Sequence, residues 1–251
     1  MLDPSSSLSG AAPRWAASGT LIRVADGTVT CCGRPVELSR RERTVATAIA
    51  VQPRPLRTEH LARLLFPDRD DDDAAKMVKV YVYRARQRVG PDFIVRTCGG
   101  YALGPNVTVD LHAGRLAQER LTRSDAPLHA DERRALLELA RGLRCGGDDA
   151  AAEGEWWEAI LQRAVRLGRD LGIAVARNAL TSGDTRGAAA IALELTYEDA
   201  SDESAWELLI RAKLLEGDHR EAIRSFRSYE KALASDLGAA PSSYLRDLIA
   251  R

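Results

Sequence analysis

The chain has few cysteines, few lysines and few aromatic residues. Its four cysteines are Cys31, Cys32, Cys98 and Cys145, and they form no Cys-x-x-Cys pair, so their spacing predicts neither a zinc site nor a disulfide framework. No apolar run approaches the ~20 residues that span a bilayer, and the N-terminus lacks the basic and then apolar layout of a secretory signal. These absences predict a protein of the reducing cytoplasm that has no metal site.

Motifs of common enzymes are absent as well. The sequence contains no Gly-x-x-x-x-Gly-Lys phosphate loop and no Gly-x-Ser-x-Gly elbow. Adjacent side chains of a strand point to opposite faces, so we expect one of Cys31 and Cys32 to be buried and both to be unreactive. The four histidines are scattered along the chain: His60, His112, His129 and His219. We therefore expect no catalytic residues and no cofactor.

The charge of the chain is balanced overall but is divided unevenly along it. Of 251 residues, 36 are basic and 36 are acidic. Residues 20–105 carry 15 basic and 10 acidic side chains, a net charge of +5, whereas residues 106–251 carry 20 and 25, a net charge of −5. Such a division is expected where one half of a protein binds a polyanion. Chance segregation of surface charge is the alternative.

The first half begins with strands and continues with helices. Three short runs of strand-forming residues cover 21–24, 28–31 and 35–38, and Asp26-Gly27 predicts a tight turn between the first two. A first helix is expected from Ser39, whose capping box with Glu42 can satisfy two backbone N–H groups.

Prolines and a capping residue bound the next segments. Pro53 ends the first helix, and Thr58 is the predicted cap of a second helix that Pro67 ends.

A third predicted helix carries the main functional signal. Val78, Val82, Ala85 and Val89 form one apolar stripe, and Gly90-Pro91 closes the helix. The opposite face has no acidic residue and carries Lys76, Lys79, Tyr83 and Arg86, with Arg84 beside them. A helix of this kind fits the DNA major groove, where Arg and Lys donate to guanine and to phosphates. The alternative is an ordinary solvated face.

A β-hairpin with paired glycines follows over residues 93–103, and Arg96 lies near its tip, where it could enter a minor groove. Strands, three helices and a terminal hairpin together predict a winged helix-turn-helix. Residues 20–105 resemble the OmpR/PhoB-type winged-helix domain on four segments, Leu38–Glu42, Leu61–Pro67, Val78–Val89 and Gly99–Tyr101. The resemblance implies that the third helix contacts the major groove and the hairpin the minor groove.

Carried over by position, the resemblance implicates Lys76, Lys79, Tyr81, Tyr83 and Arg84 on the helix and Arg96 or Thr97 on the wing. It also implies that the acidic loop before this helix touches RNA polymerase, through Asp70, Asp71 and Asp72. Simple capping of the helix N-terminus by these aspartates is the alternative.

The second half is rich in helix formers and contains an internal repeat. Leu180–Asp184 recurs as Leu214–Asp218 at an offset of 34 residues, which is the tetratricopeptide period. Trp206, Leu209, Ala222 and Phe226 match the interlocking of small and large residues in that repeat, and a weaker copy ends at Gly147-Asp148. We expect about three helix pairs. Of the adjacent Trp156 and Trp157, only one can face a single core, and the other could mark an interface.

The tail Asp236–Leu248 resembles the end of the bacterial transcriptional activator domain (BTAD), which follows a winged helix in SARP-type activators. The predicted fold class is thus an α+β winged helix-turn-helix joined to an all-α, tetratricopeptide-like domain. The predicted parts are a disordered or loosely ordered tail over 1–19, the winged helix over 20–105 and the activator domain over 106–251.

The predicted function is sequence-specific binding of double-stranded DNA and activation of transcription through RNA polymerase. Homodimers on tandem half-sites and effector or partner input through the repeats are part of this interpretation. With no receiver or nucleotide-binding domain in the sequence, we expect control through abundance, through a ligand or partner, or through oligomerisation. The alternative function is a protein-interaction scaffold with little or no DNA binding.

Overall fold

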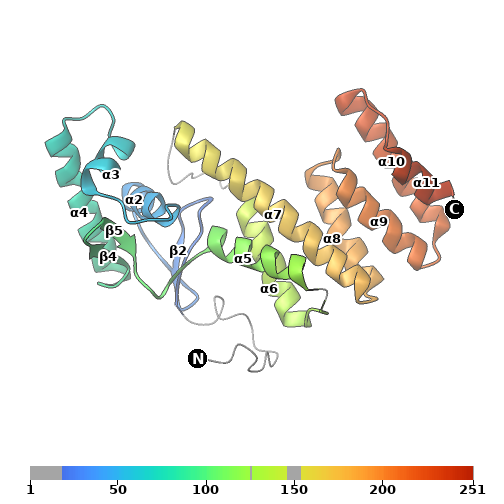
Figure 1. The fold of residues 1–251 in the computed structure, drawn as a ribbon, viewed down its shortest axis with the longest axis horizontal. Coiled ribbons are helices and arrows are strands. Elements are labelled where there is room, and N and C mark those ends of the chain that lie inside the picture. Colours follow the sequence, from blue (N-terminus) through green and yellow to red (C-terminus); the bar gives the residue numbers. More distant parts are fainter. Residues whose placement is uncertain (1–18, 125, 146–153, 251) are drawn as a thin grey trace. The chain divides into compact units, whose positions relative to one another are not determined.

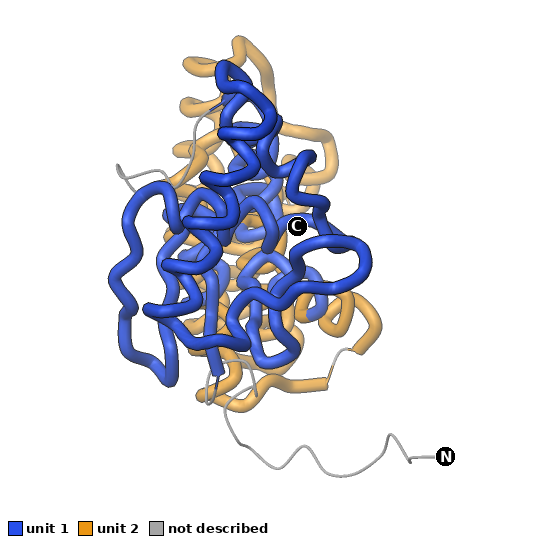
Figure 2. Tube along the Cα trace, turned by 90° about the vertical axis from the view of Figure 1, so that its left-hand side faces the viewer, with its two compact units in different colours: residues 1–116, 138–168 blue, residues 117–137, 169–251 orange. Residues whose placement is uncertain are grey.

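A computed structural model describes residues 19–124, 126–145 and 154–250, so nearly all of the predicted N-terminal tail lies outside the described residues. Figure 1 labels the helices and strands along the chain. The chain forms two compact units, which Figure 2 distinguishes by colour. Unit 1 comprises Met1–Leu116 and Glu138–Gly168, and unit 2 comprises Ala117–Leu137 and Arg169–Arg251. The functional division between residues 105 and 106 stays a prediction.

Unit 1 contains a four-stranded sheet in the order β3-β2-β1-β6. The strands are β1 (Thr20–Ile22), β2 (Val29–Cys31), β3 (Arg34–Val36) and β6 (Val107–Val109). The first three pair in antiparallel fashion, as successive strands joined by tight turns should, whereas β6 joins β1 in parallel. The three predicted strands are present, and β6 was not predicted.

The cysteines next to β2 correct the sequence expectation. Cys31 ends the strand and is partly exposed, while Cys32 lies in the following turn at a φ of 49° and is exposed. Because Cys32 has left the extended backbone, the alternation of faces does not apply to it. Neither cysteine is buried.

A buried carboxyl group stands at the junction of the sheet and the next helix. Asp110 begins α5 (Asp110–Arg123), and both of its carboxyl oxygens accept from the backbone N–H of Val24, at 3.0 and 3.1 Å. The N–H of Leu111 donates to Oδ1 at 2.7 Å. Burial raises the pKa of Asp110 to about 7, and these hydrogen bonds and the charge of Arg23 oppose the shift.

The first two helices of unit 1 are α2 (Arg40–Ala50) and α3 (Thr58–Leu65). The capping box predicted for α2 is confirmed, because the Ser39 N–H donates to Glu42 Oε2 at 2.8 Å and the Ser39 side chain accepts from the Glu42 N–H. The cap predicted for α3 is wrong. Thr58 is the first residue inside that helix and is buried, and the cap position is Arg57, which makes no side-chain capping bond.

The third helix, α4 (Asp71–Val89), begins before the predicted apolar stripe and buries Val78, Val82 and Ala85. Gly90 ends it at a φ of 141°, as the sequence predicts. The hairpin that follows pairs β4 (Ile94–Thr97) with β5 (Gly100–Leu103). The helices α2, α3 and α4 contact one another, and β4 contacts α4, which completes the winged helix-turn-helix.

The remaining helices are α6 (Ala130–Arg144), α7 (Glu155–Thr181), α8 (Thr185–Glu198), α9 (Glu203–Leu215), α10 (His219–Leu237) and α11 (Ser243–Ala250). Contacts join α8 to α9, α9 to α10 and α10 to α11. The helix pairs predicted from the repeat are confirmed at two equivalent turns. Gly183 and Gly217 take φ values of 83° and 78°, and the aspartate after each caps the next helix. The weaker copy at Gly147-Asp148 lies outside the described residues.

Interlocking side chains and ion pairs hold unit 2 together. The rings of Trp206 and Tyr229 lie 6.0 Å apart, and the small Ala222 is fully buried, as the repeat pattern predicts. Arg169 binds the carboxylate of Asp202 through two nitrogens, at 2.5 and 2.6 Å.

In unit 1, Trp157 is buried and Trp156 is partly exposed, which confirms that adjacent tryptophans cannot share one core.

Candidate nucleic-acid interface

The solvent-facing side of α4 presents cations and one large aromatic ring. From Lys76 onward, the exposed residues are Lys76, Lys79, Val80, Tyr83, Arg84, Gln87 and Arg88, and the first six share one side of the helix. The Tyr83 side chain is 62% exposed, which is unusual for a ring of its size. The buried apolar stripe on the opposite side fixes the rotation of the helix, so this face points away from the core.

The first cation of the face is already paired. Lys76 Nζ lies 3.1 Å from Asp73 Oδ1, and both side chains are largely exposed. The hydrogen bond to Asp73 raises the pKa of Lys76, which therefore stays charged at any physiological pH. An exposed pair of this kind is weak because water screens it, so a phosphate can compete for the lysine.

Arg84 rests on a stack of rings. Its guanidinium carbon lies 5.9 Å from the centre of the Tyr81 ring, and that ring stacks on Phe66 at 6.2 Å. Tyr81 is only partly exposed, so the structure places it beneath Arg84 rather than on the outer face. Stacking restricts the arginine fork before any ligand arrives, which reduces the entropy lost on binding.

Arg86 connects α4 to the wing. Its Nε donates to the carbonyl oxygen of Ile94 in β4 at 2.6 Å, and its guanidinium lies 5.9 Å from the centre of the Tyr101 ring in β5. The side chain is partly buried, so these contacts give Arg86 a structural role. The predicted contact of Arg86 with DNA stays a prediction.

The two wing residues from the sequence lie at the turn of the hairpin. Arg96 is exposed, with its guanidinium 5.6 Å from the centre of the Tyr101 ring. Thr97 Oγ1 accepts from the Gly99 N–H at 3.3 Å and donates to the Gly100 carbonyl at 3.2 Å. Tyr101 thus lies between Arg86 on α4 and Arg96 on the wing, which fixes the wing relative to the helix.

The aspartates before α4 have different environments. Asp70 is the N-cap residue and accepts from the Asp72 N–H at 3.0 Å, while Asp71 pairs with Arg63 at 3.1 Å. All are exposed. Among the residues that the structure describes, the carboxylate of Asp72 has neither an ion pair nor a capping bond. Capping therefore accounts for part of the run, and Asp72 is left facing solvent.

Two residues of the exposed face of α4 were missed from the sequence. Val80, 45% exposed, and Gln87 continue the row that begins at Lys76, because positions 76, 80, 83 and 87 share one side of a helix. Helical spacing alone would have identified both. A valine can contact a thymine methyl group and a glutamine can pair with adenine.

Within the described ranges, the structure has no cluster of His, Cys, Asp and Glu side chains suited to a metal ion. The helices described there include none with the length and hydropathy needed to cross a membrane.

Comparison with known proteins identifies the second half of the chain. The model of the bacterial transcriptional activator domain matches residues 109–251. No curated protein matches. Among solved structures, the chain is similar to Mycobacterium tuberculosis EmbR in complex with a low-affinity phosphopeptide, with a TM-score of 0.66 and 21% identity. The alignment covers 93% of this chain and 64% of the EmbR chain, so this chain spans less than two thirds of that structure. That likeness shows the fold, and the family model shows that the chain belongs to the bacterial transcriptional activator domain family.

Proposed function

We propose that this protein is a sequence-specific DNA-binding regulator that activates transcription. The observation that carries the proposal is the exposed face of α4, where Lys79, Tyr83 and Arg84 face solvent. The helix α4 itself contacts β4 of the wing (Figure 1). A helix held in this way by its apolar side can enter the major groove with its exposed side toward the bases. Arg96 at the tip of the hairpin then reaches the neighbouring minor groove.

The side chains of this face divide by the contacts they can make. Lys76 and Lys79 supply phosphate contacts, which give affinity that falls with salt. Arg84, stacked on Tyr81, supplies a rigid fork for the two acceptors of a guanine. Each good bidentate pair contributes about 1–3 kcal/mol of discrimination against the wrong base. Selection of sequence therefore depends on Arg84 more than on the lysines.

A two-step experiment tests the proposal. Genomic fragments bound by the full chain are selected and sequenced, and fluorescence anisotropy then measures affinity for the recovered site and for scrambled DNA at several salt concentrations. We expect Arg84→Ala to lose preference for the site and Lys79→Ala to weaken binding to both DNAs alike. Arg227→Ala, an exposed arginine on α10, is the matched control and should bind as the unaltered chain does. A preference retained by Arg84→Ala would contradict the residue assignment.

Recruitment of RNA polymerase is the second part of the proposal. The acidic loop before α4 presents Asp72 to solvent, and a basic surface of the polymerase is its complement. Asp72→Asn should leave DNA affinity unchanged and lower transcript yield in a reconstituted reaction. Asp70→Asn is the matched comparison, because asparagine also caps a helix. Equal transcript yields from the unaltered chain and Asp72→Asn would contradict this contact.

The repeat helices are proposed to provide oligomer or partner contacts. On α8 the side chains of Leu193 and Tyr197 are exposed, Tyr197 to 82%. An exposed apolar pair on a helical repeat also favours the alternative function, a protein-interaction scaffold. The salt series distinguishes the two functions, because a scaffold would show little DNA binding and no steep salt dependence. Sedimentation of the chain with its recovered site tests for a homodimer on tandem half-sites.

A further inference from the structure

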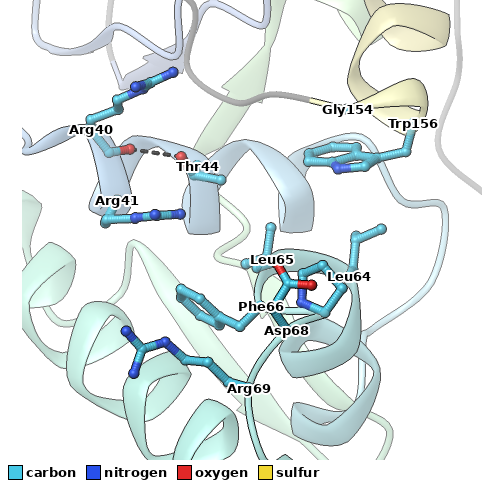
Figure 3. A pocket seen from close by; sticks show the side chains of 11 residues that line it. Arg40, Arg41, Thr44, Leu64, Leu65, Phe66, Asp68, Arg69, Gly154 and Trp156 are labelled. Carbon is cyan, nitrogen blue, oxygen red and sulfur yellow. Dashed lines mark hydrogen bonds between the residues drawn. The ribbon is translucent and has the colours of Figure 1, made fainter.

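A cavity of about 610 Å³ in unit 1 lies away from the exposed face of α4. Its walls come from the start of α2, the end of α3 with the loop that follows, and the start of α7 (Figure 3). Its volume is within the range of about 300–1,000 Å³ that is typical of pockets for small organic molecules. None of the residues proposed to contact DNA lines it, so a ligand held there would not block the duplex.

The charge of the cavity is predominantly positive. Three arginines, Arg40, Arg41 and Arg69, line it against a single carboxylate, Asp68. Neither Arg41 nor Arg69 forms an ion pair with any residue in the described ranges, and Arg41 instead lies 5.5 Å from the centre of the Phe66 ring. Guanidinium groups without acidic partners, grouped around a hollow, favour an anionic ligand.

The cavity also offers flat surfaces. Figure 3 shows the Trp156 indole and the Arg41 side chain entering it from opposite sides, with Leu64, Leu65 and Phe66 below. Trp156 is partly exposed, and its ring meets that of the buried Trp157 in a T-shaped arrangement, with 5.6 Å between the ring centres. An indole suits stacking of a planar ring, and a guanidinium in the same cavity suits an anionic group on that ring.

We propose that this cavity is a binding site for a small organic anion that contains a planar ring. The ring stacks on Trp156, and a carboxylate or phosphate group of the ligand accepts hydrogen bonds from Arg41 and Arg69. None of these three side chains is among those proposed to contact DNA. The anion can be a ring carboxylate or a ring phosphate, because a guanidinium fork matches both.

The site is linked to α4 by contacts already described. Arg41 lies on the Phe66 ring, Phe66 stacks on Tyr81, and Tyr81 supports Arg84. An anion that binds Arg41 therefore acts on the series of contacts that positions Arg84. We expect the ligand to change affinity for the DNA site, and the DNA site to change affinity for the ligand by the same factor. This second expectation rests on the proposed function, whereas ligand binding itself does not.

Four matched probes measure separately how much the ring and the negative charge each contribute to binding. Isothermal titration calorimetry on the full chain without DNA is carried out with 2-naphthoate, 2-naphthyl phosphate, neutral 2-naphthalenemethanol and inorganic phosphate. We expect one saturable site for one or both ring anions, and binding about tenfold or more weaker for the neutral ring and for phosphate alone. Tighter binding of 2-naphthoate would indicate a natural ligand with a carboxylate, and tighter binding of 2-naphthyl phosphate one with a phosphate. Absence of saturable binding by both ring anions would overturn the proposal.

Variants then locate the site. Trp156→Ala and Arg41→Ala should each weaken binding about tenfold, Trp156→Phe should retain most of it, and Arg227→Ala should leave it unchanged. Thermal melting checks that each variant folds, which is expected because Arg41 is exposed and Trp156 partly so. Unchanged binding by folded Trp156→Ala and Arg41→Ala would place the ligand elsewhere and overturn the proposal.

The same titration with the DNA site present measures the coupling. Ligand binding without any DNA binding would refute the proposed function and leave the site intact. DNA binding without ligand binding would overturn the proposed ligand site and leave the proposed function intact.

Discussion

The Nε of Arg86 in α4 donates a hydrogen bond to the carbonyl oxygen of Ile94 in β4, with 2.6 Å between the two atoms. This bond joins the helix proposed to lie in the major groove to the hairpin proposed to lie in the minor groove. The Tyr101 ring, close to both Arg86 and Arg96, closes the same junction. The angle between helix and wing is therefore fixed before DNA is bound.

Removing this bond should lower stability as well as DNA binding. Arg86→Ala leaves the Ile94 carbonyl without its donor, and hydrogen bonds to charged groups contribute about 1.5–3 kcal/mol. We expect the free energy of unfolding to fall by about 2 kcal/mol in urea titrations followed by circular dichroism. Arg84→Ala, which removes a more exposed arginine two residues away, should change it by less than about 0.5 kcal/mol. Equal losses in the two variants would contradict the structural role of Arg86.

Gly100 should not tolerate a side chain. Its φ is 127°, and a Cβ atom there would lie 2.0 Å from the carbonyl oxygen of Leu56, which accepts from the Tyr101 N–H. Gly100→Ala should therefore cost about 3 kcal/mol or more, because backbone on both sides must move. Gly33→Ala is the control, since Gly33 also has a positive φ of 76° but faces open space. That variant should cost only about 1–2 kcal/mol, and comparable melting temperatures for the two would refute the argument.

Much of this fold follows from local patterns in the sequence. The Ser39–Glu42 capping box, the buried stripe of α4 and the equivalent turns at Gly183 and Gly217 depend on residues close together in the chain, so spacing predicts them. The strand β6 was missed because its three residues gain their partner from β1, more than eighty residues earlier. Pairing over such a distance leaves no local periodicity.

The candidate sites, too, could be predicted from the sequence only where they depend on local spacing. The row of cations on α4 was predictable from helical spacing. The contact of Arg86 with Ile94 and the cavity that brings Trp156 near Arg41 depend on tertiary packing, which no spacing encodes. Sequence reasoning could name Trp156 as the tryptophan left outside a core or as an interface residue, but not the arginines it would meet.

Among the carboxylates of unit 2, replacement of Asp202 should cost the most stability. It caps α9 by accepting from the Ser204 and Ala205 N–H groups, and it also receives both hydrogen bonds from Arg169. The hydrogen bond to Asp202 raises the pKa of Arg169, so the guanidinium keeps its charge at every physiological pH. Asp202→Ala removes cap and partner together and should lower the melting temperature by an amount that corresponds to about 2–4 kcal/mol.

Asparagine at the same position separates the two roles. Asp202→Asn keeps a capping oxygen but not the charge, so it should lose about half as much stability as Asp202→Ala. Equal melting temperatures for the two variants would show that the ion pair contributes all of the effect.

The buried carboxyl of Asp110 should make folding depend on pH. Burial raises the pKa of Asp110 in the folded protein to about 7, against 3.8 for an unperturbed aspartate. Between these two values the folded state holds a proton on Asp110 that the unfolded state releases. The stabilisation that this proton gives the folded state is therefore complete below about pH 4. It declines as the pH rises from about 4 to about 7 and is lost above that range.

The comparison with Asp110→Asn isolates this group from all others. Asparagine cannot ionise, and its side-chain oxygen can still accept from the Val24 N–H. Urea titrations at several pH values between 4.5 and 8 should show that the free energy of unfolding of the unaltered chain declines more steeply with pH than that of the variant. The difference in slope should correspond to at most one proton per molecule. Parallel curves would mean that Asp110 is ionised in the folded protein throughout this range, so that its hydrogen bonds to Val24 and Leu111 outweigh the effect of burial.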